Sequence, residues 1–315
     1  MTPTARMGAA VDIGSNSIHL LVATLGRSRL RTIVDESVQL GFGSIVDRDG
    51  RLGEEARAAG TDVLRGYVEQ GRALGARSIT LMGTEPLRRA ADRSAFQADV
   101  LAATGVALHV LSHEAEAELT LLGVTSGQLP LETLLVLDIG GGSTELVVAA
   151  PDADQVVGAL PTGSARLAAG FVAHDPPTAE EIGALRNVAI RLFSTMPQAR
   201  PTRAIVAGGT GTNTNRLLGR TRLGSLDPRL LERAMVALAI EPAAQIAGRT
   251  GLSERRVRQL AAGISLVEAM LSRYDLPRAA TSDASLREGA IHAADRAGDA
   301  WPDRLTSLIH GAHPA

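Results

Sequence analysis

The stretch VDIGSNSIHLLVA, residues 11–23, decides the fold because most of it returns as LDIGGGSTELVVA, residues 137–149. The two copies start 126 residues apart, and seven of the twelve positions that begin with Asp12 and Asp138 are identical. Each copy is an apolar run that ends in an aspartate, then a turn of small residues, then a second apolar run. The repetition predicts two units of one architecture, each with the same turn at the end of a buried strand.

Both turns have the chemistry of a phosphate-binding loop. Gly14 in the first copy and residues 140–142 in the second allow backbone N–H groups to approach a ligand closely. Successive small residues form anion-binding concavities, to which the neighbouring serines and Thr144 add hydroxyl groups. The aspartates repel phosphate, but they suit Mg²⁺, which typically takes one or two carboxylates and leaves its other positions to water and substrate phosphate.

Each turn leads into a segment with the pattern of a strand. A dinucleotide-binding loop or a Walker loop would open a helix. Here the segments Ser17–Leu25 and Thr144–Ala149 are apolar and rich in β-branched residues, which favours strands. We therefore expect each phosphate turn to lie in a β-hairpin.

The composition narrows the classes of function. The 315 residues include no cysteine, which excludes disulfides, thiolate metal sites and thiol nucleophiles. All 32 basic residues are arginine, so any phosphate-binding cation is a guanidinium, whose fork of donors matches phosphate oxygens. A net charge of −2 and 2% aromatic residues argue against nucleic acid as a partner. Without a long apolar stretch or a signal-peptide pattern, we expect no membrane association and a cytoplasmic location.

The order of expected elements repeats like the opening motif. Three strands are followed by helix, strand and helix in the first half, and the second half begins again with three strands. Gly83-Thr84 and Gly209-Thr210 also stand 126 residues apart, each after a short apolar strand. The sequence thus predicts two similar α/β domains, residues 1–125 and 126–315, with a ligand cleft between them.

Several candidate residues also have a structural reading. Glu116 stands between Glu114 and Glu118 on an expected helix, and such charged faces are often simply solvated. Asp12 and Asp138 could cap turns, although their duplication favours a ligand-binding role.

Four further candidates are open in the same way. Glu145 could be a solvent-facing strand residue rather than a metal ligand. Thr84 could be a helix N-cap and Arg88 part of an ordinary helix surface. The segment 208–212 either binds a phosphate or nucleoside, or turns a strand into a helix.

The motifs taken together resemble one known family. Two such halves are similar to the actin, sugar-kinase and heat-shock-chaperone superfamily, whose domains have a ribonuclease H-like fold. Within it the chain resembles the exopolyphosphatase / guanosine-pentaphosphate phosphohydrolase (Ppx/GppA) family through VDIGSNSIHLLVA, GTEPLR, LSHEAEAELTLLGV, LDIGGGSTELVV, LPTGSARL, AGGTGTN and SLREGAI. These segments run from Val11 to Ile291 in family order. The chain looks like the short form, without the C-terminal metal-dependent phosphohydrolase-like domain of longer members.

The resemblance assigns roles to positions that match the family's motifs. The phosphate-binding residues fall on Gly14, Ser15, Asn16, Ser17, Thr84, Arg88, Gly140, Gly141, Gly142, Ser143 and Thr144, to which we add Gly209 and Thr210. The metal ligands, for Mg²⁺ or alternatively Mn²⁺, fall on Asp12, Asp138 and Glu145, and the catalytic base falls on Glu116. The base usually lies in Ser-Gly-x-Glu-Glu-Ala; here His113 replaces the glycine and Ala115 the first glutamate.

The resemblance implies an exopolyphosphatase that releases orthophosphate from inorganic polyphosphate by Mg²⁺-assisted attack of water. Guanosine pentaphosphate 5′-phosphohydrolase is the close alternative, because both reactions act on a terminal phosphoanhydride. A nucleotide-dependent kinase of the superfamily and a non-catalytic polyphosphate or nucleotide sensor are weaker hypotheses, the second motivated by His113 and Ala115. A homodimer is expected from the family.

Overall fold

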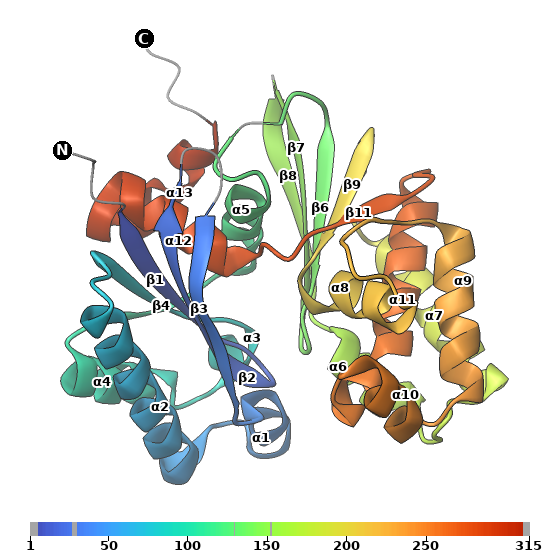
Figure 1. Cartoon of the computed structure of the whole chain (residues 1–315), viewed down its shortest axis with the longest axis horizontal. Helices are drawn as coiled ribbons and strands as arrows, with labels where there is room; N and C mark the ends of the chain where they lie inside the picture. The colour runs from blue at the N-terminus through green and yellow to red at the C-terminus, as the bar shows by residue number, and fades with distance from the viewer. Residues whose placement is uncertain (1–5, 27–29, 129, 152, 311–315) are drawn as a thin grey trace. The chain divides into compact units, whose positions relative to one another are not determined.

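The computed structural model describes residues 6–26, 30–128, 130–151 and 153–310. The chain divides into two compact units, each built on its own sheet (Figure 1). Unit 1 comprises Met1–Leu129 together with Ala284–Ala315, and unit 2 comprises Pro130–Asp283. The two sheets with flanking helices confirm the prediction of two α/β units.

Within the described residues, the sheet of unit 1 has five strands in the order β3-β2-β1-β4-β5. Their bounds are β1 Met7–Ile13, β2 Ser17–Leu25, β3 Leu30–Gln39, β4 Ser78–Gly83 and β5 Leu108–Val110. The first three strands form an antiparallel meander, while β4 and β5 run parallel to β1. The prediction that the first glycine turn lies in a β-hairpin is confirmed, because β1 and β2 flank it and pair antiparallel.

The sheet of unit 2 repeats this plan with an added strand, again counting the described part of the chain. The order of its six strands is β10-β11-β9-β6-β7-β8. Their bounds are β6 Leu134–Ile139, β7 Thr144–Ala150, β8 Ala153–Leu160, β9 Arg203–Ala207, β10 Ser225–Leu226 and β11 Ala279–Thr281. The antiparallel trio β6, β7 and β8 matches β1, β2 and β3, and β9 is parallel to β6 as β4 is to β1.

Helices cover both faces of the first sheet (Figure 1). The helices of unit 1 are α1 Phe42–Asp49, α2 Gly53–Ala73, α3 Glu85–Arg89, α4 Arg93–Thr104, α5 His113–Val124, α12 Leu286–Ala297 and α13 Trp301–His310, with a 3₁₀ turn at Gly298–Ala300. The core between α2, α4 and the sheet includes Phe42 and Phe96, whose rings meet edge to face at 5.9 Å between centroids. Burial of such aromatic and aliphatic surface is the main stabilising term for the unit.

The helices of unit 2 pack into a second core. They are α6 Ser164–Phe171, α7 Ala179–Ser194, α8 Gly208–Leu217, α9 Pro228–Ile240, α10 Ala243–Thr250 and α11 Glu254–Arg273. Two of these helices, α7 and α9, begin at the N-capping residues that the sequence predicts. Thr178 and Glu181 form the predicted capping box of α7, and Asp227 caps α9 by accepting a hydrogen bond from Leu230 N.

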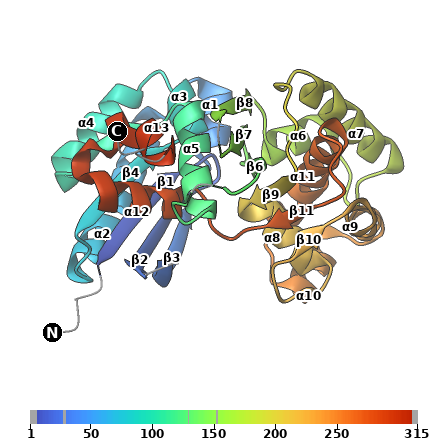
Figure 2. The ribbon, with the colours of Figure 1, turned by 90° about the horizontal axis from the view of Figure 1, so that it is seen from above.

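The end of the chain departs from the expected division into residues 1–125 and 126–315. The segment from Ala284 returns to unit 1, where α12 and α5 lie side by side (Figures 1 and 2). The two helix backbones almost touch, because a Cβ on Gly289 would lie 1.8 Å from Leu119 O and one on Gly123 would lie 2.1 Å from Ser285 O. Only glycines permit this close approach of the two helices. Helix α12 therefore belongs to unit 1, together with α5. The outermost residues of the two predicted domains, 1–5 and 311–315, lie outside the described residues.

Candidate active site

The carboxyl ends of β1, β4 and β5 meet at one edge of the first sheet. Gly83 is in register with Ile13 on one side and Val110 on the other, and all three strands are parallel. Thr84 ties two of the loops together, since both its N–H and its hydroxyl donate to Ile13 O at 3.2 Å. Leu111 N donates to Gly83 O at 2.9 Å in the same way. Such an edge is where open α/β sheets bind their ligands.

The first glycine turn is held by the segment that comes after the meander. Gly14 N donates to Ser17 O at 3.1 Å and closes the turn. Gly43 N donates to Ser15 O at 2.8 Å and Gly41 N donates to Asn16 O at 3.0 Å. A trans peptide is planar with its C=O and N–H opposed, so the N–H groups of Asn16 and Ser17 face away from α1. Successive backbone N–H groups of this kind are the donors that an anion-binding turn uses.

The second glycine turn repeats this geometry with another helix. Gly140 N donates to Ser143 O at 3.0 Å, the counterpart of the bond that closes the first turn. The backbone of α6 binds the turn from behind, because Ser164 N donates to Gly140 O at 2.9 Å and Ala165 N donates to Gly141 O at 3.0 Å. Arg166 Nη1 donates to Gly142 O at 2.7 Å. By peptide planarity, the three N–H groups from residue 141 to residue 143 face away from α6.

The predicted metal ligands of unit 2 lie opposite each other on neighbouring strands. Asp138 and Glu145 are directly paired across β6 and β7, and the Glu145 side chain is buried. Gly208 has φ +73°, and a Cβ there would lie 3.1 Å from Asp138 Oδ1, so glycine leaves room around this carboxylate. Two adjacent carboxylates fit the donor set of Mg²⁺. Among the described residues, no three His, Asp or Glu side chains gather as metal ligands.

The third predicted metal ligand, Asp12, lies in unit 1 on the face of β1 that turns toward α12. A Cβ on Gly8 would come within 2.9 Å of the Ile291 side chain, and side chains alternate along a strand. Arg287 on α12 has a side chain only 13% exposed, and it binds Asp35 at 2.6 Å. Burial lowers the pKa of Arg287, but the carboxylates of Glu288, Asp35 and Asp12 outweigh burial and raise it. Arg287 thus belongs to the surroundings of Asp12, a role that the sequence alone left open.

The expected base and the expected phosphate-binding arginine meet in the structure. Arg88 Nη1 donates to Glu116 Oε2 at 2.6 Å and to Leu111 O at 3.0 Å. The two side chains are 15% and 9% exposed, so water screens their charges only weakly. Glu116 is therefore not part of a solvated helix face.

His113 completes this cluster on the first turn of α5. Its Nδ1 lies 3.1 Å from Arg88 Nη2, and because a guanidinium only donates, Nδ1 is the acceptor. Burial and then the charge of Arg88 lower the pKa of His113. His113, which replaces the glycine of the family motif, thus contacts Arg88, the arginine that binds Glu116.

Glu85 is a residue of this site that sequence reasoning missed. It is 4% exposed at the start of α3, and it accepts a hydrogen bond from Ser15 Oγ at 2.9 Å. Arg89 Nη1 donates to its other oxygen at 2.8 Å. Glu85 thereby fixes the hydroxyl of the first glycine turn. The signal was present in GTEPLR, between Thr84 and Arg88, but its partner lies 70 residues away.

The remaining candidate phosphate-binding residues, Ser17, Gly209 and Thr210, are described by their contacts within the protein. Ser17 Oγ lies 2.6 Å from His19 Nε2, so this hydroxyl already has a partner on the strand. Gly209 and Thr210 lie in the first turn of α8, where Thr210 is buried. A Cβ on Gly263 would be 2.8 Å from the Thr210 side chain, which therefore packs against α11. The phosphate-binding role of both residues stays a prediction.

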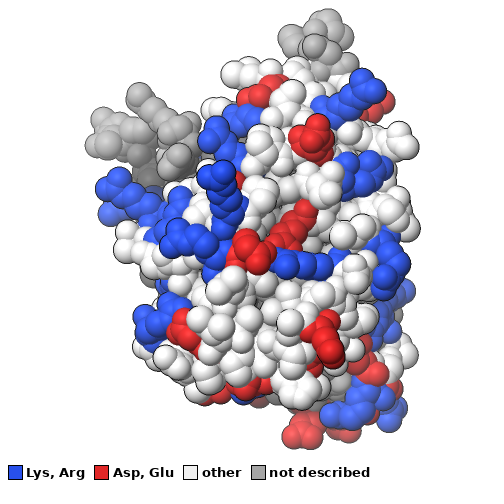
Figure 3. All heavy atoms as spheres, turned by 90° about the vertical axis from the view of Figure 1, so that its right-hand side faces the viewer, with Lys and Arg blue, Asp and Glu red and all other residues white. Residues whose placement is uncertain are grey.

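The surface charge of unit 2 is mixed. On the face shown in Figure 3, arginines alternate with acidic side chains and with uncharged surface. Over the residues that the structure describes, no helix has the length and apolar character needed to cross a membrane.

Two duplicated α/β units, each with an aspartate-led glycine turn, define a protein with the actin-like two-domain fold. The model of the Ppx/GppA phosphatase family matches residues 21–294, and the chain belongs to this family. The crystal structure of the Aquifex aeolicus family member superposes with a TM-score of 0.82 at 25% identity, covering 93% of this chain and 99% of that one. An exopolyphosphatase structure from Cytophaga hutchinsonii gives a TM-score of 0.78 at 21% identity, covering 98% of this chain and all of that one, which supports the fold.

Curated relatives have two kinds of name. Exopolyphosphatase 2 of Mycobacterium tuberculosis is 34% identical over 193 residues, which are 57% of this chain and 59% of that protein. The guanosine-5′-triphosphate,3′-diphosphate pyrophosphatase of Aeromonas hydrophila is 34% identical over 140 residues, which are 44% of this chain and 28% of that protein. A Haemophilus influenzae relative, also named as an exopolyphosphatase, is 24% identical over 91% of each chain. Both names describe hydrolysis of phosphoanhydrides.

Proposed function

We propose that the chain is an exopolyphosphatase, which hydrolyses the terminal phosphoanhydride of inorganic polyphosphate and releases orthophosphate. The observation that carries the proposal is the buried pair of Arg88 and Glu116 on the loops that follow β4 and β5. The glycine turn after β1 lies at the same end of the sheet, and its N–H groups face away from α1. A carboxylate, a guanidinium and a phosphate-binding turn at one edge are the parts that phosphoryl transfer to water needs.

In the proposed chemical step, Glu116 is the general base. Water attacks the terminal phosphorus while the bond to the bridging oxygen breaks, and that oxygen keeps the electron pair. The proton of the water passes to the Glu116 carboxylate, which must lie within hydrogen-bond reach of it. The positive charge of the Arg88 guanidinium would stabilise the charge on the phosphoryl oxygens.

In this proposal, the two glycine turns bind phosphate groups of the polyphosphate substrate. In unit 1 the contacts come from the backbone of Gly14–Ser17, and Thr84 fixes the neighbouring loop. In unit 2 they come from the backbone of residues 140–144, with Gly209 and Thr210 as further candidates.

Asp138 and Glu145 would hold Mg²⁺ in unit 2, and Asp12 is the candidate carboxylate in unit 1. The paired carboxylates and the space left by Gly208 fit such an ion. When bound, the ion would neutralise charge on phosphate oxygens. The protein residues fix the position of the carboxylates, since Asp138 and Glu145 lie on strands and not on loops.

Guanosine pentaphosphate is the alternative substrate, because its 5′-triphosphate ends in the same phosphoanhydride. The curated relatives carry both names, and the same turns and base would serve either reaction. A homodimeric state and a cytoplasmic location stay predictions from the sequence.

The experiment measures orthophosphate release from short-chain polyphosphate and from guanosine pentaphosphate with Mg²⁺. We expect Glu116→Gln to lower kcat by about 10²- to 10⁴-fold, the usual contribution of a general base. Glu118→Gln is the matched control, because Glu118 is buried two residues further along α5 but accepts a hydrogen bond from Thr306 of α13. Equal losses in both variants would reject Glu116 as the base. Tight polyphosphate binding without release by the wild type would favour the sensor hypothesis, and phosphate transfer to an acceptor would favour the kinase.

A further inference from the structure

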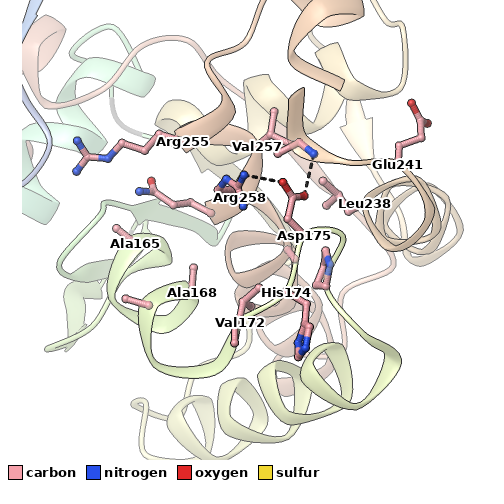
Figure 4. A pocket seen from close by; sticks show the side chains of 16 residues that line it. Ala165, Ala168, Val172, His174, Asp175, Leu238, Glu241, Arg255, Val257 and Arg258 are labelled. Atoms are coloured by element: carbon pink, nitrogen blue, oxygen red, sulfur yellow. Dashed lines mark hydrogen bonds and ion pairs between the residues drawn. The ribbon is translucent and has the colours of Figure 1, made fainter. Parts of the chain in front are cut away.

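The cavity of unit 2 is lined by carboxylates whose partners lie within the protein. It has a volume of about 380 Å³ and lies between α6 and α11 (Figure 4). Asp175 binds Arg258 at 2.6 Å and accepts a hydrogen bond from Ala243 N at 2.8 Å. Both oxygens of Glu241 accept hydrogen bonds from Arg249, at 2.9 and 3.0 Å. These carboxylates therefore connect neighbouring segments of unit 2.

Glu85 of unit 1 differs from these carboxylates because one of its partners is a glycine turn. It is 4% exposed at the start of α3, and its two oxygens have different partners. Oε2 accepts a hydrogen bond from Ser15 Oγ at 2.9 Å, and Oε1 accepts one from Arg89 Nη1 at 2.8 Å. Arg89 in turn pairs with Asp47 of α1 at 2.6 Å. A chain of polar and charged contacts thus runs from the first glycine turn through α3 to α1.

Helix α1 holds the same serine by its backbone. Gly43 N donates to Ser15 O at 2.8 Å, and a Cβ on Gly43 would lie 2.7 Å from the Ser15 side chain. Ser15 is thus fixed at its carbonyl by α1 and at its hydroxyl by Glu85. Because a peptide is planar, the Ser15 carbonyl sets the direction of the Asn16 N–H, which is a donor of the turn. The anchoring of Ser15 therefore determines how this donor is presented.

The hydroxyl of Ser15 is committed to this anchoring. A serine hydroxyl has one proton to donate, and an ionised carboxylate only accepts. Glu85 accepts that hydrogen bond in the structure, so the same hydroxyl does not donate to a phosphate oxygen while the bond is present. Arg89 balances the charge of Glu85, and Asp47 is half-exposed, where water screens its charge. Glu85 therefore does not place an uncompensated charge beside the turn.

We propose that Glu85 is a positioning residue, which holds Ser15 so that the first glycine turn presents its backbone N–H groups to a phosphate group of the substrate. Ser15 contributes through this anchoring and not through a hydrogen bond to phosphate. The inference rests on the proposed function, because it concerns the phosphate that the turn binds. If Glu85 only stabilised α3, its loss would lower the free energy of unfolding without changing the affinity for phosphate.

A double-mutant cycle of Ser15→Ala, Glu85→Ala and both substitutions together isolates the contact. The probe is inorganic tripolyphosphate with Mg²⁺. Phosphate release gives KM and kcat, and titration calorimetry gives the dissociation constant in the Glu116→Gln background, where hydrolysis is expected to be slow. We expect each single variant to raise KM and the dissociation constant by about 10-fold, or 1.4 kcal/mol, and to change kcat by less than about two-fold. The double variant should equal the single variants, because each substitution removes the same bond.

Glu118→Ala is the matched control, because Glu118 is also a buried carboxylate of unit 1 but accepts a hydrogen bond from Thr306 of α13. It should leave the tripolyphosphate affinity unchanged and add nothing to the loss in Ser15→Ala. Circular dichroism checks that each variant is folded.

Additive losses in Ser15→Ala and Glu85→Ala, or an unchanged affinity in either one, would overturn the proposal. Ser15→Ala removes only a hydroxyl, so it keeps the test decisive even if Glu85→Ala does not fold. If the wild type binds tripolyphosphate but releases no phosphate, the hydrolase proposal fails, whereas the calorimetric cycle still decides the role of Glu85.

Discussion

Arg88 donates a 2.6 Å hydrogen bond to Glu116, so the side chain expected to bind phosphate holds the side chain expected to activate water. Both are largely buried, and Arg88 also donates to Leu111 O and contacts His113. The pair links the loop after β4 to the first turn of α5. It follows that changes at Arg88 affect the base as well as the substrate.

Removing the charge of Arg88 leaves a buried carboxylate without its cation. We expect Arg88→Gln to lower the free energy of unfolding by about 3–5 kcal/mol, the usual cost of breaking a buried ion pair from one side. Urea unfolding would measure it, with Arg93→Gln as control, because Arg93 is exposed and its guanidinium donates to the backbone carbonyl of Arg88.

The double variant Arg88→Gln, Glu116→Gln separates the ion pair from simple packing. It should recover part of the lost stability, since neither side then leaves a buried charge. Additive losses in the double variant would contradict a coupled pair. Phosphate release should remain low in all variants that lack Glu116.

The half-buried histidines of unit 1 predict a loss of stability in acid. Burial is the main cause that lowers the pKa of His109, His113 and His292, and for His113 the charge of Arg88 is second. The unfolded chain, with ordinary histidine pKa values near 6.5, then binds more protons than the folded chain. Stability is therefore full above about pH 6.5 and falls as the pH drops below it.

Replacing one histidine at a time would show this in urea unfolding between pH 7.5 and 5.5. We expect His113→Asn to flatten part of the pH dependence, because asparagine keeps an acceptor for Arg88 but does not titrate. A slope that His113→Asn leaves intact would show that His113 does not contribute.

The proposed ion site predicts a specific dependence on Mg²⁺. Chelation should abolish phosphate release, and added Mg²⁺ should restore it. Asp138→Asn should raise the Mg²⁺ concentration for half-maximal activity by at least about 10-fold, in line with losses seen on disturbing metal sites. Asp154→Asn, an exposed carboxylate on β8, should change nothing. Identical Mg²⁺ curves for Asp138→Asn and wild type would reject the site.

The sequence predicted those features that depend on neighbouring residues. The strand periodicity and the repeated aspartate-led turn were enough for both hairpins, and the capping residues located the starts of α7 and α9. Helix α1 was missed because it is short and begins among Gly41 and Gly43, whose presence suggests a loop. Glycine at 43 is needed because a Cβ there would lie 2.7 Å from the Ser15 side chain.

Features that depend on distant contacts were not predictable in this way. Glu85 acts on Ser15 from 70 residues away, and His113 was recognised as a departure from the family but not as a neighbour of Arg88. The burial of Thr210 depends on packing with α11, which the sequence around Thr210 does not indicate. Such contacts form only when the sheet brings separate strand ends together.

The return of the chain end to unit 1 gives the last prediction. We expect Gly289→Ala to lower the free energy of unfolding by about 3 kcal/mol or more, because its methyl group would meet the backbone carbonyl of Leu119, which cannot rotate away. Gly66→Ala is the matched control, since Gly66 is exposed within α2 and no atom lies within 4 Å of its Cβ position. Without that clash, alanine should raise stability by about 0.5–1 kcal/mol through its better helix propensity. Urea unfolding would compare the two, and a stabilising effect at both positions would mean that α12 does not pack against α5.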